Sequence, residues 1–158
     1  MPFVPTPYTT ELEADTYLAS NAAYMAMSTS VKSTTRSKAR IYLDSQFRYK
    51  GQTYSTDQEG AWPRTGFYSD GIYWPGGVVH DLVKQAECEL AGYIANGTDL
   101  FPAETQPGQV KRVLGQVGPL KSETEYSTGR QSQPQFSYIR AMLKPLLLDG
   151  GGVILERA

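Results

Sequence analysis

One stretch of the chain, residues 61–96, decides the fold and has the sequence AWPRTGFYSDGIYWPGGVVHDLVKQAECELAGYIAN. Its second half, residues 78–96, predicts the longest helix, because apolar side chains recur there at spacings of three and four residues. These side chains are Val79, Leu82, Val83, Ala86, Leu90, Tyr93 and Ile94, whereas Lys84, Gln85, Glu87 and Glu89 fall mainly off the apolar face. Gly97 follows directly and favours the left-handed conformation that ends helices.

The first half of the stretch combines aromatic residues with turn formers. Trp62, Phe67, Tyr68, Tyr73 and Trp74 are interrupted by Pro63, Gly66, Gly71 and Pro75. We expect an irregular cover, neither regular helix nor regular strand, whose rings pack against the long helix.

The rest of the chain predicts three further helices. Thr10 and Glu13 form a capping-box pattern, so a short helix is expected from Glu11. A Ser/Thr-rich connector, residues 28–35, then leads into a second helix in which Arg36, Ala39, Arg40, Leu43 and Phe47 line up at helical spacing. The last helix, residues 136–147, is kinked or shortened by Pro145.

Residues 110–117 and 120–126 predict two short strands joined at Gly118 and Pro119. If these two residues form the whole loop, Arg112 faces Glu125 across the pair. At the chain's end, glycines 150–152 precede an apolar triplet, residues 153–155, that resembles an unpaired β-strand able to add to the sheet of another protein. A tail that folds back on its own domain or stays disordered is an equally open alternative.

The expected fold class is mainly α: a small bundle of about four helices with a short β-hairpin and extended arms at both ends. A chain of 158 residues fits one domain with a modest core. We expect an extended arm over residues 1–10, ordered only where something holds it, one helical domain over residues 11–148 with its hairpin at about 110–126, and a Gly-hinged tail over residues 149–158.

The composition does not indicate a particular class of partner. Charged residues make up 20% of the chain and the net charge is −1, so bulk electrostatics does not require a nucleic acid, a membrane surface or an acidic substrate. No apolar run approaches the ~20 residues that cross a bilayer, and the N-terminus lacks a signal-peptide pattern. The single cysteine, Cys88, cannot form an intrachain disulfide and is expected to be a buried, inert thiol.

No catalytic motif stands out. The single histidine, His80, cannot build a metal site with Asp81 and the distant Cys88. A nucleophile elbow, a phosphate loop and a dinucleotide fingerprint are all missing from the sequence. We therefore expect no enzyme, no cofactor and no metal. Eleven tyrosines and two tryptophans, spread over loops and arms as well as helices, favour a protein that assembles with others.

A series of short motifs carries a family resemblance. In chain order they are ARIYLD (39–44), AWPRTG (61–66), AECELA (86–91), VGPL (117–120) and MLKPLL (142–147). This series resembles a tailed-bacteriophage head-completion family, whose members look like the adaptor beneath the portal in the head-to-tail connector. Related sequences are also labelled as DnaT-like single-stranded DNA-binding proteins. The resemblance covers most of the chain from about Glu11 onward.

The resemblance implies a structural protein of the virion neck, made in the host cytoplasm. Identical subunits would form a ring, expected to be twelve-fold, that binds the portal on one side and a stopper or tail-terminator protein on the other. Heterologous contacts between copies close such rings. The candidate subunit-interface residues are Arg64, Tyr68, Tyr73 and Trp74. For Arg64 the alternative is that its guanidinium satisfies loop carbonyls, and Trp62 is expected to fill the core.

Two further contact sets follow from this interpretation. The apolar tail residues Val153, Ile154 and Leu155, with Arg157, are expected to dock on the portal. Genomic DNA passing through the channel would touch Lys111, Arg112 and Lys121 without sequence preference.

The alternative function is binding of single-stranded DNA. The basic segment from Arg36 to Lys50, with Tyr42, Phe47 and Tyr49, could stack bases and neutralise phosphates. The nearly neutral net charge argues against it.

Overall fold

The computed structural model describes residues 5–101, 110–114, 123–126 and 136–148, and this part of the chain is mainly α-helical, as predicted. The helices are α1 (Glu11–Tyr17), α2 (Ala22–Met25), α3 (Thr29–Gln46), α4 (Asp81–Ala95), α5 (Ser137–Leu143) and the 3₁₀ turn η1 (Lys144–Leu146). The strands are β1 (Gln52–Thr53), β2 (Arg64–Thr65), β3 (Phe67–Ser69), β4 (Ile72–Trp74), β5 (Val110–Leu114) and β6 (Glu123–Tyr126). None of the helices in the described ranges is long and apolar enough to span a bilayer.

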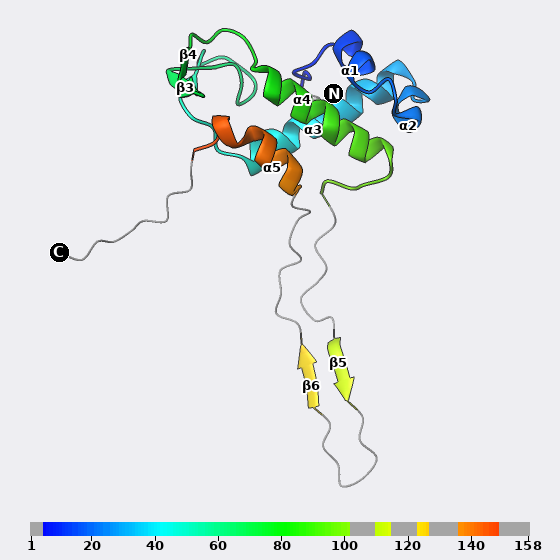
Figure 1. Ribbon diagram of the computed structural model, residues 1–158. Helices are drawn as coiled ribbons and strands as arrows, with labels where there is room; N and C mark the ends of the chain where they lie inside the picture. Colours follow the sequence, from blue (N-terminus) through cyan, green and yellow to red (C-terminus); the bar gives the residue numbers. More distant parts are fainter. Residues whose placement is uncertain (1–4, 102–109, 115–122, 127–135, 149–158) are drawn as a thin grey trace, which may run out of the picture. The chain divides into compact units, whose positions relative to one another are not determined.

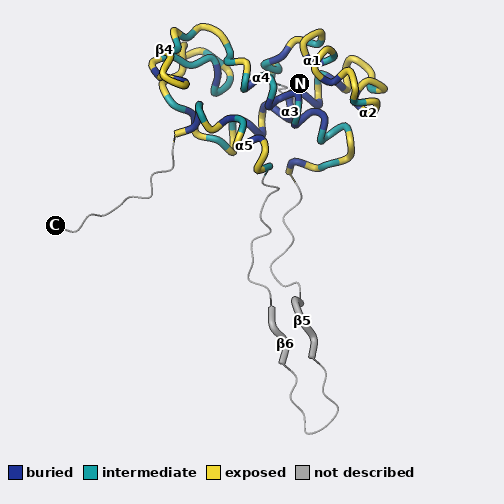
Figure 2. The backbone as a smooth tube through the Cα atoms, in the orientation of Figure 1, coloured by how far each residue is buried: buried dark blue, intermediate teal, exposed yellow. Residues whose placement is uncertain are grey.

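The chain divides into two compact units. One contains all the helices and strands β1 to β4, and the other, within residues 99–135, contains β5 and β6. In the helical unit α3 and α4 pack against each other, and α5 packs against α4 (Figure 1). The side chains that fill this core are fully buried, and include Leu43, Val83, Leu90, Ile139 and Leu143. Figure 2 shows buried residues along α3, α4 and α5.

The long helix ends where predicted, but it begins at Asp81, three residues later than predicted, and with 15 residues it is shorter than α3, which has 18. His80 is its N-cap, and the imidazole Nδ1 accepts a hydrogen bond of 3.2 Å from the Leu82 N–H. Gly97, with φ of 90°, follows the C-cap Asn96. Helix α1 also begins as predicted, since Thr10 and Glu13 form a complete capping box.

The prediction of a connector over residues 28–35 is wrong, because α3 already begins at Thr29. Ser and Thr are weak helix formers, so tertiary contacts decide this segment. Lys32 is buried, and its ammonium lies 2.8 Å from a carboxylate oxygen of Asp15 on α1. Asn21 caps the short helix α2 by accepting a hydrogen bond of 3.1 Å from the Tyr24 N–H.

The irregular cover expected over residues 61–77 contains a regular β-hairpin. Strands β3 and β4 pair antiparallel, with Phe67 opposite Trp74 and Tyr68 opposite Tyr73. Asp70 and Gly71 form the turn with φ of 49° and 81°, and two positive φ values are typical of the type I′ turn that favours Asp-Gly. The dipeptide was the signal for this hairpin.

The predicted packing of the aromatic rings against the long helix holds only in part: Trp62 and Trp74 lie beside the ring of its N-cap His80, at centroid distances of 6.3 and 4.6 Å, whereas Tyr68 and Tyr73 are exposed. The indole of Trp62 is 2% exposed and meets the rings of Tyr49 and Phe67 edge-on, at centroid distances of 5.4 and 5.8 Å. The predicted core role of Trp62 therefore holds.

Pro145 shortens the last helix as predicted: α5 ends at Leu143 and the chain continues as the 3₁₀ turn. In the second unit, β5 and β6 pair antiparallel with Arg112 opposite Glu125, which is the predicted register. The predicted turn at Gly118 and Pro119 lies outside the described residues, as do the glycines 150–152.

Candidate binding surfaces

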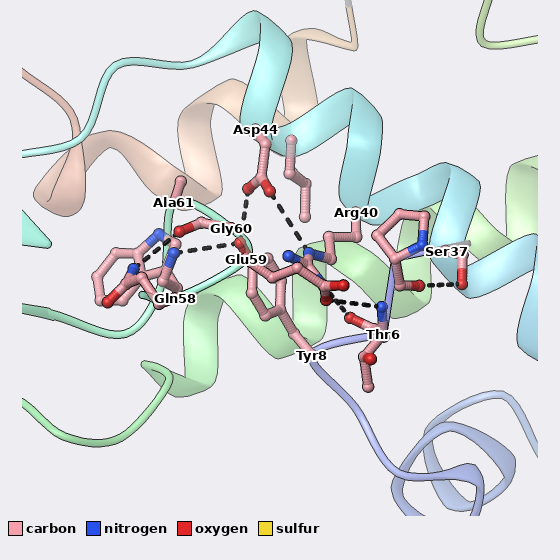
Figure 3. A network of polar contacts seen from close by, with 12 residues as sticks. Thr6, Tyr8, Ser37, Arg40, Asp44, Gln58, Glu59, Gly60 and Ala61 are labelled. Carbon is pink, nitrogen blue, oxygen red and sulfur yellow. Dashed lines mark hydrogen bonds and ion pairs between the residues drawn. The ribbon is translucent and has the colours of Figure 1, made fainter. Parts of the chain in front are cut away.

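The first candidate site holds an extended segment, Pro5–Thr9, which we call the arm. Side chains of α3, α4 and the loop before β2 bind its main chain, and Figure 3 shows Ser37 and Arg40 of α3 and Glu59 of the loop around it. Their hydrogen bonds run from Ser37 Oγ to Pro5 O (2.7 Å), from Arg40 Nη1 to Thr6 O, from Thr6 N to Glu59 Oε2 (3.2 Å), from Tyr8 N and Thr9 N to Glu87 (2.7 and 3.0 Å), and from Arg36 Nη1 to Thr9 O. This set of groups is the arm site. The arm is ordered because these groups hold it.

The arm site also recognises the side chain of Tyr8. The Tyr8 hydroxyl donates to the Asp44 carboxylate (2.7 Å) and accepts from the main-chain N–H of Trp62 (3.1 Å). The guanidinium of Arg40 lies 4.8 Å from the centre of the Tyr8 ring, a cation–π distance. Burial, followed by the charge of Asp44, raises the pKa of Tyr8, so the phenol stays protonated and remains a donor.

Glu87 is the residue of this site that the sequence prediction missed. It was expected off the apolar face of α4, but it is completely buried and accepts from the Thr9 hydroxyl as well as from two N–H groups. Burial raises its pKa to about 7, although the hydrogen bonds of the arm and the charge of Arg36 act in the opposite direction. Its spacing of four from Val83 and three from Leu90 was the available signal.

The surface predicted for single-stranded DNA on α3 is wrong for its central residues. Arg36 and Arg40 are 5% and 4% exposed, and both guanidiniums bind the arm. Tyr42 and Tyr49 are buried as well. These cations stabilise the arm, and they are not available to phosphates.

A second candidate site consists of three exposed cations, Arg48, Arg140 and Lys144, which we call the α5 basic face. Arg140 and Lys144 are four residues apart, one helical turn. Arg48 comes beside this segment because its carbonyl accepts from the Leu148 N–H (2.9 Å) and Tyr49 bridges to Leu147. None of the three forms an ion pair with a carboxylate in the described ranges. Tyr138 on the same helix is 56% exposed.

A third candidate is the aromatic hairpin surface, which comprises Tyr68, Ile72 and Tyr73. They are 64%, 73% and 52% exposed, and the two tyrosine rings meet edge-on at 5.4 Å. Asp70 at the turn is also exposed. Exposed apolar side chains gathered on one hairpin are typical of interaction surfaces.

The predicted subunit-interface residues separate into two groups. Tyr68 and Tyr73 are exposed, whereas Trp74 is partly buried and lies 4.6 Å from the His80 ring. Arg64 donates to the carbonyls of Lys50, Ala61, Tyr49 and Gly51, at distances of 2.8, 3.2, 3.3 and 2.7 Å. The structure thus favours the alternative for Arg64, in which the guanidinium satisfies loop carbonyls.

The other predicted contacts have no described side chains. Lys111 and Arg112 belong to β5, while Lys121, Val153, Ile154, Leu155 and Arg157 lie outside the described residues. In the described part of the chain, no three His, Cys, Asp or Glu side chains form a group that could hold a metal ion.

Comparison with protein-family models gives a match over most of the chain. A family model described as "Putative DnaT-like ssDNA binding protein" matches residues 7–158. The matched region begins within the arm and includes the α5 basic face and the aromatic hairpin surface. No curated protein and no solved structure matches.

Proposed function

Because this chain belongs to the DnaT-like ssDNA-binding protein family, we propose that it binds single-stranded DNA through the α5 basic face and catalyses no reaction. The observation that carries the proposal is the set of exposed cations Arg48, Arg140 and Lys144, none of which forms an ion pair with a carboxylate of the described residues. Most other cations of the described residues already bind carboxylates or carbonyls of the chain itself.

The binding would depend on charge and stacking. Guanidinium and ammonium groups neutralise phosphates and release the counterions condensed on the strand, which favours binding without reading sequence. An exposed aromatic ring such as Tyr138 can stack on an unpaired base, which adds ~1–3 kcal/mol per base. Tyr138 lies two residues before Arg140 and so on another side of α5, and a strand would have to pass around the helix to meet both kinds of group.

Paired substitutions test this proposal. We expect Arg140→Gln with Lys144→Gln to weaken binding of a labelled oligothymidine of about 20 nucleotides. Each phosphate contact on a single strand contributes about 0.7 to the slope of the logarithm of the association constant against the logarithm of salt concentration. Loss of two contacts should therefore lower the association constant roughly 25-fold at 0.1 M salt. Fluorescence anisotropy measures the change. Lys38→Gln is the matched control, since Lys38 is exposed on α3 but lies outside this face. Equal weakening by the control, or none by the pair, would contradict the proposal.

A second candidate function is the head-to-tail connector adaptor of a tailed phage. The aromatic hairpin surface favours it, because two exposed tyrosines and Ile72 suit a protein interface and the exposed Asp70 would repel phosphates. In this proposal the surface joins neighbouring copies of a ring that binds the portal, a stopper or tail-terminator protein, and passing DNA. The ring would be part of the virion neck.

Electron microscopy of the protein mixed with its cognate portal tests the connector proposal. We expect ring-shaped particles with the native chain and their loss with Tyr68→Ser and Ile72→Ser. Leu12→Ser is the matched control, because Leu12 is 77% exposed on α1, away from the hairpin strands. Rings that persist in the hairpin variant would refute the role of this surface, and absence of any particle would refute the adaptor function.

A further inference from the structure

The arm site has the chemistry of a peptide-binding site. The rest of the helical unit binds main-chain atoms of Pro5, Thr6, Tyr8 and Thr9. The binding side chains come from α3, α4 and the loop before β2. Within the arm itself, no backbone hydrogen bond joins Pro5, Thr6, Tyr8 and Thr9 to one another. The arm is therefore held as an extended ligand is held, by the groups around it.

Two ionisable side chains are buried while the arm occupies this site. Glu87 is 0% exposed and Arg36 is 5% exposed, and both bond to Thr9. A buried carboxylate or guanidinium that loses its hydrogen-bond partners costs several kcal/mol. When the arm leaves, another extended segment with the same main-chain donors and acceptors is the favourable replacement.

Recognition at this site is specific at two positions. The Tyr8 ring lies under Arg40 with its hydroxyl bonded to Asp44, and the Thr9 hydroxyl donates to Glu87. Pro5 and Pro7 restrict the backbone to extended conformations. This restriction lowers the entropy cost of binding for the segment, whether it belongs to the same chain or to another molecule.

We propose that the arm site is a peptide-recognition site that also binds residues 5–10 of a second copy of the chain, in exchange for its own arm. The ligand class is an extended peptide that carries Tyr-Thr after a proline. Five residues of extended chain reach about 17 Å, so exchange would join copies that lie directly side by side. This inference is independent of the DNA-binding proposal.

A labelled peptide with the sequence of residues 5–10, PTPYTT, tests the inference by fluorescence anisotropy. The full-length chain with Tyr8→Phe and Thr9→Val has a weakened arm, because it lacks the hydroxyl bonds to Asp44 and Glu87, while every group of the receiving site is unchanged. Apparent affinity rises with the fraction of molecules whose site is open. We expect the peptide to bind this variant at least about 10-fold more tightly than it binds the native chain.

Two comparisons make the result decisive. Adding Glu87→Gln to the weakened variant should abolish the gain, and a peptide with alanine in place of Tyr8 and Thr9 should not bind. Tyr8→Phe alone keeps the Thr9 bonds to Glu87 and serves if the double variant is poorly folded. Equal peptide binding by native and weakened chains, or binding that ignores Glu87→Gln, would overturn the inference.

Discussion

The buried Glu87 makes a quantitative prediction about stability and pH. Its pKa is about 7 in the folded chain against an ordinary value of 4.5. The folded protein thus binds this proton more tightly than the unfolded chain, so the stability from Glu87 is fully present below about pH 4.5 and is lost as the pH rises to 7. At 1.36 kcal/mol per pKa unit the whole effect is about 3 kcal/mol, of which about 2 kcal/mol falls between pH 5.5 and 8.

Urea unfolding followed by the fluorescence of the buried Trp62 measures this effect. Across that pH interval, the unfolding free energy of the native chain should fall by about 2 kcal/mol more than that of Glu87→Gln. Glu13→Gln is the control, because hydrogen bonds from Lys84 and Thr10 lower the pKa of the exposed Glu13 to about 2, outside the interval. Parallel curves for native protein and Glu87→Gln would refute the argument that burial governs this carboxylate.

Three further substitutions test the fold. Arg40→Gln should cost about 2 kcal/mol of unfolding free energy in a urea titration, since it leaves the Thr6 carbonyl without its donor and removes the cation over the Tyr8 ring, whereas Lys38→Gln should stay within about 0.5 kcal/mol. Gly71→Ala should lower the free energy of unfolding by about 1 kcal/mol. The positive φ at this position is the only cause, because an added Cβ meets no atom within 4 Å. Thr10→Ala should cost about 1 kcal/mol by removing the α1 cap, and a loss of helical circular dichroism on melting reports it.

Helix periodicity and capping could be predicted from the sequence because they are local. The end of α4 at Gly97 and the start of α1 at Thr10 follow from residues within one turn, whereas α4 begins after the cap His80, three residues beyond the predicted start. The register of β5 with β6 could also be predicted, because the positions of Gly118 and Pro119 indicate where the turn lies.

The candidate sites depend on contacts between distant segments, which periodicity does not reveal. Arg36 and Arg40 look like a cationic face on α3 until the arm, some 30 residues earlier, is seen to bind them. Glu87 likewise meets Thr9 across 78 residues of chain. The polar residues at buried positions were consequently assigned to solvent, although the same positions carry the network that orders the arm.

The most direct test of the DNA-binding proposal is the salt dependence of oligothymidine binding by the native chain. If Arg48, Arg140 and Lys144 each contact one phosphate, the logarithm of the association constant should fall against the logarithm of salt concentration with a slope of about −2. This corresponds to a loss of roughly 18-fold between 50 and 200 mM salt. A slope near zero, or no binding at 50 mM salt, would contradict the account.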